Sequence, residues 1–218
     1  MIHVINTHNS VLNSFLAEIR DKDIQTDRMR FRRNLERVGE ILAYEISKTF
    51  AYRSVTVETP INPVAVMLPV QEVVIATVLR AGLPFHQGFL NYFDKAGNAF
   101  VSARRAYSRV EGQIDIRFDS VYTPDLTGKQ LLLVDPMLAT GKSLVITYRE
   151  LLKQGSCPVH THIASVIASR QGVDYVEKEL GTGAVSLWTA ALDDNLTDKY
   201  YIDPGLGDAG DLAFGGKL

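Results

Sequence analysis

The sequence has one cysteine among its 218 residues, Cys157, and no apolar segment approaches the length of about 20 residues that a bilayer span requires. A single cysteine excludes an intramolecular disulfide and a cysteine-based zinc cluster, and it is compatible with a reducing cytoplasm. The first residues, MIHVINTHNS, lack the charged and then apolar pattern of a signal peptide. We therefore expect a cytoplasmic protein without a membrane segment.

Net charge is also small, because 23 basic residues stand against 25 acidic ones, which gives a formal charge of -2. This balance creates no global field that would attract nucleic acid or an anionic membrane, so a small ligand is the better expectation. The hydrophobic fraction of 46% and the charged fraction of 22% are ordinary for a globular protein. No repeat or low-complexity linker divides the chain, so residues 1–218 are expected to form a single domain.

The most informative segment is QLLLVDPMLATGKS, at residues 130–143. Its apolar start predicts a strand buried on both faces, which ends at Pro136 because a residue before proline avoids helical geometry. A helical pattern follows, so the turn between them should lie at the carboxyl edge of a sheet, where helix N–H groups can bind a phosphate. Thr140 and Ser143 would add hydroxyl donors, and Gly141 would let the main chain approach the ligand.

The same segment allows two alternatives to a phosphate site. One is a plain strand–turn–helix connection that binds nothing. The other is the P-loop of a small-molecule kinase, since Gly141, Lys142 and Ser143 match the end of the G-x-x-x-x-G-K-[ST] pattern. Pro136 stands where that pattern needs its first glycine, and proline cannot adopt a positive φ, which argues against a P-loop.

Predicted strands and helices alternate along the rest of the chain. Apolar periodicity predicts helices within residues 10–50 and at 83–93, 144–153 and 172–180, and buried strands at 72–79, 99–103, 161–168 and 184–190. We expect a half-buried strand at 54–59, a plain connection around the three prolines that follow, and an exposed β-arm or hairpin at 107–122. The alternation predicts an α/β fold with a central, mostly parallel sheet flanked by helices.

Two segments have an unusual composition. Five arginines crowd residues 28–37, where a solvated face, a subunit contact and an anion site are all open. The C-terminal segment YIDPGLGDAGDLAFGG, residues 201–216, mixes glycines and aspartates with apolar residues. It is either a disordered chain end or a backbone folded tightly against another part of the protein, and the apolar residues favour the second.

Three segments are expected to converge at the carboxyl edge of the sheet: residues 79–82, 135–143 and 205–211. Together they would supply a phosphate cradle, an arginine for a second anionic group, an acidic residue for hydroxyls or a metal, and bare backbone for a flat ligand. A sugar phosphate that carries a leaving anion would use the first three features, and a planar base would use the last.

The motifs VLRAG (78–82), VDPMLATGKS (134–143) and YIDPGLGDAGD (201–211) resemble those of the uracil phosphoribosyltransferase family, and the resemblance covers nearly the whole chain in order. Members of that family make UMP and diphosphate from uracil and phosphoribosyl pyrophosphate (PRPP). The resemblance implies a type I phosphoribosyltransferase-like fold with N-terminal helices (1–50), a β-arm (107–122) and a C-terminal base-binding segment (192–218). It also implies transfer of a glycosyl group without a protein nucleophile.

The same resemblance implies the site residues. Those expected to bind PRPP are Arg80, Arg105, Asp135, Pro136, Met137, Leu138, Ala139, Thr140, Gly141, Lys142, Ser143 and Asp208. Those expected to bind uracil, largely through main-chain groups that match the edge of the base, are Ile202, Gly207, Asp208 and Ala209. Arg80 and Asp208 would be catalytic, with Asp208 the best candidate for a general base. Lys142 stands where relatives commonly have a second glycine.

The implied cofactor is Mg²⁺, held mainly by PRPP and water rather than by protein ligands. Uracil and PRPP are the expected partners, with no membrane and no nucleic acid. The predicted β-arm favours a homodimer or a larger homo-oligomer, and GTP is a further effector to consider because it activates some relatives. A pyrimidine-responsive RNA-binding regulator on the same fold is the alternative function, with the arginine-rich segment as its contact surface.

Overall fold

The computed structural model describes residues 2–107 and 114–216, without the side chains of residues 104–107 and 114–118. The strands of its main sheet are β1 (Ile2–Val4), β4 (Val73–Leu79), β5 (Gly97–Tyr107), β6 (Ile114–Tyr122), β7 (Gln130–Val134), β8 (Met137–Leu138), β9 (His160–Ser169) and β10 (Val185–Asp193). Within the described residues these eight strands lie in the order β1-β10-β9-β7-β4-β5-β6, with β8 beside β9. Neighbours run parallel except β5 and β6, which are antiparallel.

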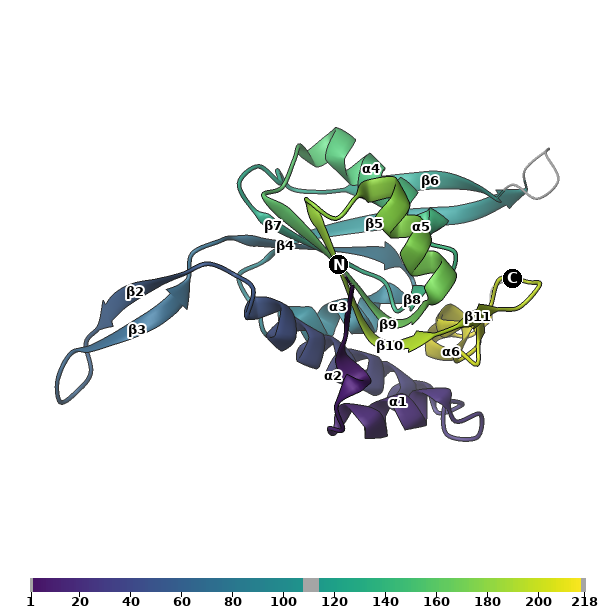
Figure 1. Cartoon of the computed structure of the whole chain (residues 1–218), viewed down its shortest axis with the longest axis horizontal. Coiled ribbons are helices and arrows are strands. Elements are labelled where there is room, and N and C mark those ends of the chain that lie inside the picture. The colour runs from purple at the N-terminus through teal and green to yellow at the C-terminus, as the bar shows by residue number, and fades with distance from the viewer. Residues whose placement is uncertain (1, 108–113, 217–218) are drawn as a thin grey trace.

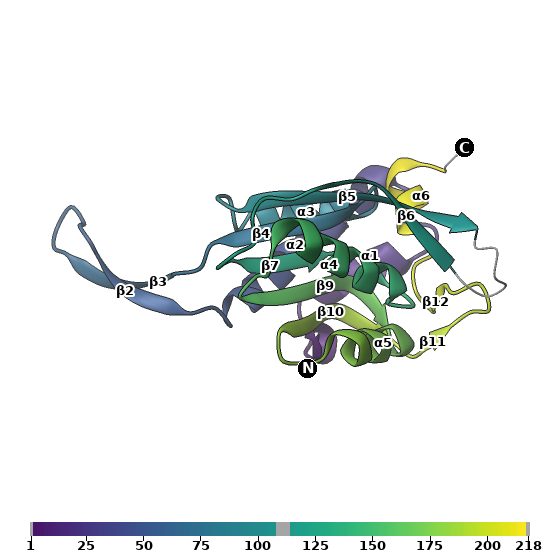
Figure 2. The same ribbon diagram turned by 90° about the horizontal axis from the view of Figure 1, so that it is seen from above.

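Helices cover both faces of this sheet, as Figures 1 and 2 show. The first face packs against α1 (Leu12–Arg20), α2 (Arg28–Ser47) and α3 (Gly82–Leu90), and the second against α4 (Lys142–Gly155) and α5 (Arg170–Leu180). Alternate residues of β7 divide between the layers, since Leu132 and Val134 belong to the first core and Leu131 and Leu133 to the second. A strand buried on both faces is therefore apolar throughout, and the prediction of a mostly parallel, doubly covered sheet is confirmed.

The N-terminal segment forms a short 3-10 helix, η1 (Ile5–Thr7), followed by α1 and α2. Asp27 begins α2, because its Oδ1 accepts the main-chain N–H groups of Met29 and Arg30, both at 3.0 Å. Its apolar stripe, which includes Phe31 and Leu35, is fully buried. No helix in the described part of the chain combines the length and apolarity needed to cross a bilayer.

A separate two-stranded ribbon, β2 (Tyr52–Val57) with β3 (Val64–Pro69), extends far from the body (Figures 1 and 2). Nearly all of its residues are exposed, including Ile61 at the turn, which is 88% exposed. The strand expected at 54–59 is present as β2, but it is exposed rather than half-buried, because no layer covers either face of the ribbon. The expected connection around Pro60, Pro63 and Pro69 is also wrong, since a strand lies between the last two, where a ribbon edge tolerates proline.

The hairpin expected at 107–122 is the β5–β6 pair, which completes one edge of the main sheet. Residues 108–113 of that expectation lie outside the described residues. At the other edge, the short parallel strand β1 pairs with β10 and was not predicted, because three residues carry no readable period.

The C-terminal segment is ordered and returns to the carboxyl edge of the sheet (Figure 1). Its elements are β11 (Asn195–Leu196), β12 (Ile202–Asp203) and α6 (Ala209–Phe214). Ile202, Leu206, Ala209 and Ala213 are all buried in the core that also contains α1 and α2. The tightly folded alternative is therefore the correct one for this segment.

Candidate active site

The turn that follows β7, residues 135–141, is fastened to β9. The main-chain N–H of Asp135 donates to the carbonyl of Ala164 at 3.1 Å, and the Pro136 carbonyl accepts two further N–H groups from β9. Ser169, which caps α5, donates its hydroxyl to the Ala139 carbonyl at 2.6 Å. The turn thus has a fixed shape that does not depend on the C-terminal segment.

Gly141 is required at the end of this turn for two reasons. Its φ of 75° is a left-handed conformation that other residues rarely adopt, and an added β-carbon would lie 2.7 Å from the carbonyl oxygen of Gly172. α4 begins at the next residue without a side-chain cap. The first N–H groups of α4 therefore remain as donors at the carboxyl edge of the sheet, which is the arrangement that binds phosphate.

The side chains of the turn divide by exposure. Pro136 and Leu138 are buried and support the turn from below, whereas Thr140, Lys142 and Ser143 are half-buried and accessible. The last three make no hydrogen bond or ion pair with any other residue that the structure describes. Two hydroxyls and one ammonium group are thus available to an anionic ligand.

Three other residues of the turn face its interior or its own backbone. Met137 and Ala139 are half-buried and pack against the first core. Asp135 is half-buried, and its Oδ1 accepts the N–H of Met137 at 3.1 Å. The Asp135 carboxylate is therefore held in one orientation at the start of the turn.

The turn after β4 lies next to the turn after β7, because the Thr77 hydroxyl donates to the Val134 carbonyl across these neighbouring strands at 3.0 Å. Arg80 in this turn is 41% exposed in its side chain. Its Nη2 donates to the Gly215 carbonyl at 3.1 Å and lies 3.8 Å from Oδ1 of Asp211. Arg80 therefore joins the sheet edge to the C-terminal segment.

Arg105 lies in β5, three residues beyond Ser102, which pairs with Leu79 at the end of β4. Because β4 and β5 are parallel, the Arg105 backbone extends past the same carboxyl edge. Its side chain lies outside the described residues.

The C-terminal segment packs against the turn that contains Arg80. A β-carbon on Gly210 would lie 3.9 Å from that of Ala81. Asp208 caps α6, because its Oδ1 accepts the N–H groups of Gly210 at 2.8 Å and Asp211 at 3.0 Å. Gly207, just before it, has a φ of 94°. The expected convergence of the three segments at one edge is present.

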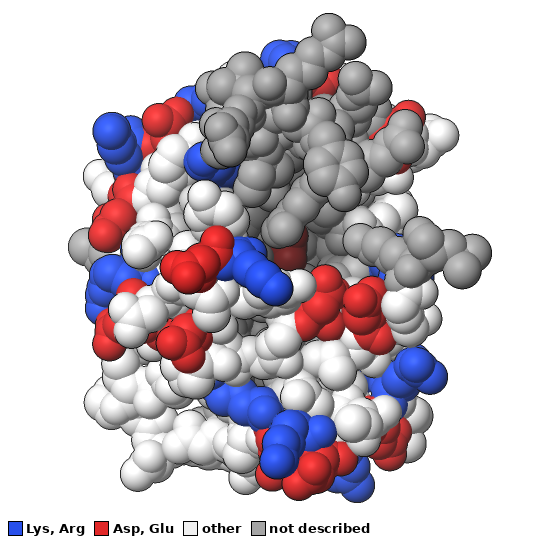
Figure 3. All heavy atoms as spheres, turned by 90° about the vertical axis from the view of Figure 1, so that its right-hand side faces the viewer, with Lys and Arg blue, Asp and Glu red and all other residues white. Residues whose placement is uncertain are grey.

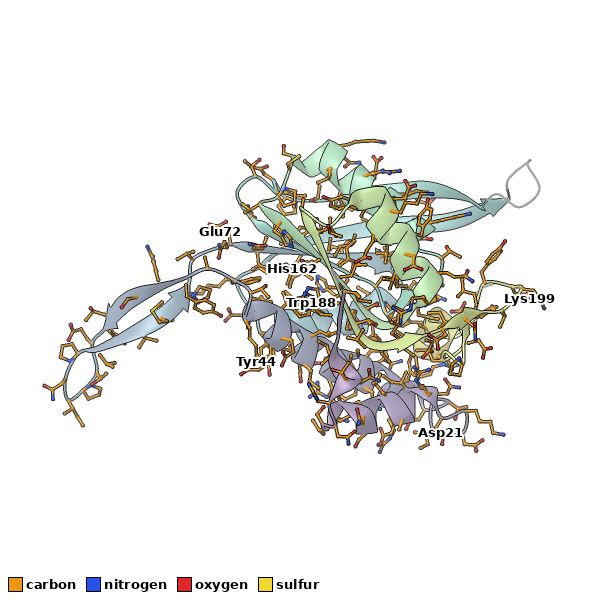
Figure 4. The ribbon with its side chains drawn as sticks, viewed as in Figure 1. Asp21, Tyr44, Glu72, His162, Trp188 and Lys199 are labelled. Atoms are coloured by element: carbon orange, nitrogen blue, oxygen red, sulfur yellow. The ribbon has the colours of Figure 1, made fainter. Side chains whose placement is uncertain are left out.

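A pocket of about 520 Å³ opens along the same segment. It is lined by Thr197, Asp198, Lys199, Tyr201, Ile202, Asp203, Pro204 and Gly207. Ile202 and Ala209 are each only 3% exposed, and of the two only Ile202 lines the pocket. Lys199 extends outward from this part of the chain in Figure 4.

Some residues that shape this edge were not predicted. Arg20 of α1 and Asp193 at the end of β10 form a close ion pair that also binds Gly205. No local pattern connects residues so distant in sequence. Ser169 could have been found, because a serine between a predicted strand and a predicted helix is a typical helix cap.

The arginine-rich start of α2 is largely committed to contacts within the chain. Arg30 pairs with Glu18 at 3.0 Å, Arg33 with Glu36 at 2.6 Å, and Arg32 donates to the Ala213 carbonyl at 2.7 Å. On the face that Figure 3 shows, acidic and basic side chains are interspersed rather than gathered into one basic field. This surface offers little of what an RNA-binding face requires.

An open, mostly parallel sheet with a helix N-terminus at its carboxyl edge is an arrangement in which α/β proteins bind phosphorylated ligands. The fold is similar to that of the adenine phosphoribosyltransferase of Thermoanaerobacter pseudethanolicus, with a TM-score of 0.51 at 14% identity over 83% of this chain and 99% of that one. The chain therefore has the fold of the type I phosphoribosyltransferases.

The family model for uracil phosphoribosyltransferase matches residues 6–216. The uracil phosphoribosyltransferase of Porphyromonas gingivalis is 51% identical over 218 residues, which cover 100% of this chain and 99% of the relative. A solved structure from Aquifex aeolicus is similar with a TM-score of 0.86 and 28% identity, over 100% of both chains. The chain belongs to the uracil phosphoribosyltransferase family, and it is a pentosyltransferase.

Proposed function

We propose that the protein transfers the phosphoribosyl group of PRPP to N1 of uracil and produces UMP and diphosphate. The observation that carries this proposal is the meeting of two unlike surfaces at one sheet edge, a donor-rich turn and a segment of bare main chain. Arg80 lies between them and contacts the second. The name of the 51% identical relative supports uracil as the base.

The turn after β7 would bind the sugar phosphate. The hydroxyls of Thr140 and Ser143, the ammonium group of Lys142 and the first N–H groups of α4 would contact the 5′-phosphate. Gly141 permits their close approach. Asp135 would accept hydrogen bonds from the ribose hydroxyls, and the remaining residues of the turn would contribute main-chain groups and shape.

The C-terminal segment would bind the base. Uracil presents an acceptor, a donor and an acceptor along one edge, and main-chain groups can match this set without long side chains. Ile202, Gly207 and Ala209 would supply these groups, and Ile202 and Gly207 line the pocket along this segment. A side chain at Gly207 would hold a flat ligand away from the main chain.

The reaction breaks the bond between C1′ of the ribose and the diphosphate oxygen, which keeps the electron pair, and it forms the bond between C1′ and uracil N1. Arg80, with Arg105 as a second cation, would neutralise the leaving diphosphate. Asp208 would take the N1 proton. The protein acts by positioning and electrostatic stabilisation, and orientation alone can supply about 7–11 kcal/mol of the barrier.

Mg²⁺ fits this arrangement as a companion of the donor rather than as a resident of the protein. Among the described residues, no group of three His, Cys, Asp or Glu side chains could hold a metal. Mg²⁺ prefers phosphate oxygens and water with few carboxylates, so Asp135 and Asp208 would be its neighbours. When bound, the ion would neutralise charge on the departing diphosphate.

We also propose that the protein forms a homodimer or a larger homo-oligomer in the cytoplasm, with the β2–β3 ribbon as a contact. A lone two-stranded ribbon is marginal in water, and this one exposes apolar side chains such as Ile61 and Met67, the latter 57% exposed. Ile61→Asp should lower the mass measured by light scattering. Val159→Asp, at an exposed valine elsewhere, should leave it unchanged. An unchanged mass for the first variant would contradict this role of the ribbon.

The direct test is UMP formation from PRPP and uracil, compared with cytosine, orotate and adenine, with and without Mg²⁺ and GTP. We expect turnover with uracil that depends on Mg²⁺, and the GTP arm shows whether this chain shares that activation. Equal or faster turnover of another base would refute the assignment of uracil. An RNA-binding regulator is not favoured, because the arginines of α2 are mostly paired within the chain.

A further inference from the structure

We infer that Arg20 and Asp193 are positioning residues for base recognition: their ion pair holds the main chain at Gly205 and thereby sets the affinity for uracil. This inference rests on the proposed function. Arg20 lies in the last turn of α1, and Asp193 lies at the end of β10, where the expected base-binding segment (192–218) begins. Neither was among the individual residues expected to touch a substrate.

The ion pair binds both polar groups of one residue's main chain. The Arg20 guanidinium meets the Asp193 carboxylate with two hydrogen bonds, of 2.7 and 2.8 Å. The same guanidinium donates to the Gly205 carbonyl at 2.9 Å. Asp193 in turn accepts the Gly205 N–H at 3.0 Å. Gly205 is therefore held through its donor and its acceptor by one rigid, charge-assisted unit.

Burial makes this unit stiff. The side chain of Asp193 is 8% exposed and that of Arg20 is 25% exposed. The comparable pair of Arg149 and Glu179, between α4 and α5, is 51% and 30% exposed. A carboxylate withdrawn from water has to keep its partners, whereas an exposed pair exchanges them for solvent at little cost.

Gly205 lies between the residues that would read the base. Ile202 precedes it and Gly207 follows it, and both line the 520 Å³ pocket. Gly205 has a φ of 55°, and a β-carbon there would collide with the Ile202 carbonyl, so the turn is tight towards Ile202. A shift at Gly205 is therefore passed directly to these neighbours, and hydrogen bonds to a planar base weaken steeply with misalignment.

Two other side chains also contact the C-terminal segment, but they restrain it less fully than the pair of Arg20 and Asp193 does. Arg32 donates to the Ala213 carbonyl at 2.7 Å, and the Gln25 amide nitrogen would donate to the Leu206 carbonyl at 2.8 Å in the amide orientation that satisfies both of its polar atoms. Each of these side chains binds a carbonyl of the segment and no N–H. The pair of Arg20 and Asp193 restrains both the N–H and the carbonyl of its residue, which fixes the orientation of the peptide planes around it.

The test compares substrate KM values in Arg20→Ala, Arg20→Lys and Asp193→Asn. We expect the KM for uracil to rise by about tenfold or more in Arg20→Ala and Asp193→Asn, with the KM for PRPP within about twofold of wild type, because the turn after β7 is fastened independently. The KM for uracil of Arg20→Lys should lie between the values of these two variants and that of the wild type. Arg149→Ala is the matched control, since Arg149 also binds a carboxylate and a carbonyl, at Glu179, and should change neither KM.

A merely structural role would lower thermal stability and leave both KM values unchanged, or raise both together, and either result would overturn the inference. If Arg20→Ala does not fold, the isosteric Asp193→Asn decides the question. Hydrogen exchange of the peptide that spans 202–208 should also rise in the variants and not in Arg149→Ala. Failure of the wild-type protein to make UMP would refute the proposed function itself. That result is distinct from the KM changes that test the role of Arg20 and Asp193.

Discussion

The two halves of the candidate site are held in different ways. The turn after β7 is fixed by main-chain bonds to the adjacent strand β9 and by the cap residue Ser169, all within about one strand–helix unit. The C-terminal segment is fixed by side chains from the N-terminal helices, through Arg20 to Gly205 and Arg32 to Ala213, which are 185 and 181 residues apart in sequence.

This difference separates the two recognition tasks physically. The phosphate-binding turn carries its own geometry, because a strand end, a proline and a left-handed glycine suffice to shape it. The base-binding segment has a geometry that distant helices impose. Substitutions in α1 or α2 should therefore act on the base and spare PRPP, and substitutions around Gly141 should do the reverse.

Arg80 is the residue that joins the halves, so its removal should give the largest effect. Arg80→Ala removes a cation beside the leaving diphosphate and also the contacts with Gly215 and Asp211. We expect kcat/KM to fall on the order of 10²–10³-fold, with both substrates affected. Steady-state UMP formation measures this, with Arg149→Ala as the control. A wild-type rate in Arg80→Ala would remove Arg80 from the chemistry.

The sequence was enough to predict the turn after β7, which short-range features shape. It did not reveal the distant side chains that hold the C-terminal segment. Pro136 and Gly141 end a strand and shape a turn through their own backbone limits, so the turn after β7 could be predicted from the short segment 130–143. The ion pair of Arg20 and Asp193 joins residues 173 positions apart, and neither has a neighbour that signals it. The second strand of the ribbon, β3, was missed because proline usually marks a connection, whereas an uncovered ribbon accepts it at its ends.

Asp208 tests whether chemistry and structure can be separated within the C-terminal segment. Asp208→Asn keeps an oxygen to cap α6 and loses the negative charge, so we expect kcat to fall about 10²-fold while thermal stability stays near wild type. Asp208→Ala should lose the cap as well, at about 1 kcal/mol of unfolding free energy. Asp27→Ala, which removes the equivalent cap of α2, is the control for that cost. Equal kcat values for wild type and Asp208→Asn would exclude Asp208 as proton acceptor.

A substitution at Gly141 tests the phosphate-binding half of the site, the turn after β7. Gly141→Ala forces a β-carbon against the Gly172 carbonyl in a left-handed conformation, so we expect the KM for PRPP to rise about tenfold while the KM for uracil changes little. Gly128→Ala is a close control, because Gly128 has the same φ of 75° with nothing within 4 Å of an added β-carbon. Both variants should lose about 1–2 kcal/mol of stability to backbone strain, and only the first should lose more to the clash and affect PRPP. If both variants raise the KM for PRPP equally, the effect is general instability and the turn is not the phosphate site.

The smallest effect on the site should come from a substitution near the amino ends of the strands, away from the carboxyl edge where the site lies. His162, 3% exposed near the start of β9, lies beside Trp188, whose Nε1 donates to its Nδ1 at 3.1 Å (Figure 4). Burial, with lesser contributions from His160 and His3, lowers the pKa of His162 from 6.5 to about 3. The folded state therefore keeps this ring neutral, while the unfolded chain takes up a proton below pH 6.5.

Stability from the neutral ring is fully present above pH 6.5, and it is lost as the pH falls from 6.5 towards 3. For one group the loss is about 1.4 kcal/mol per pH unit. His162→Asn keeps an acceptor for the Trp188 N–H and cannot titrate, so its unfolding free energy should fall less steeply than that of wild type in urea titrations between pH 7 and 4. His8→Asn, at an exposed position, should follow the wild-type slope. At neutral pH both KM values should match wild type in His162→Asn, because neither the turn after β7 nor the ion pair at Gly205 depends on the amino ends of the strands. A changed KM for uracil alone would mean that the base-binding segment senses the whole sheet and not just the helices that hold it.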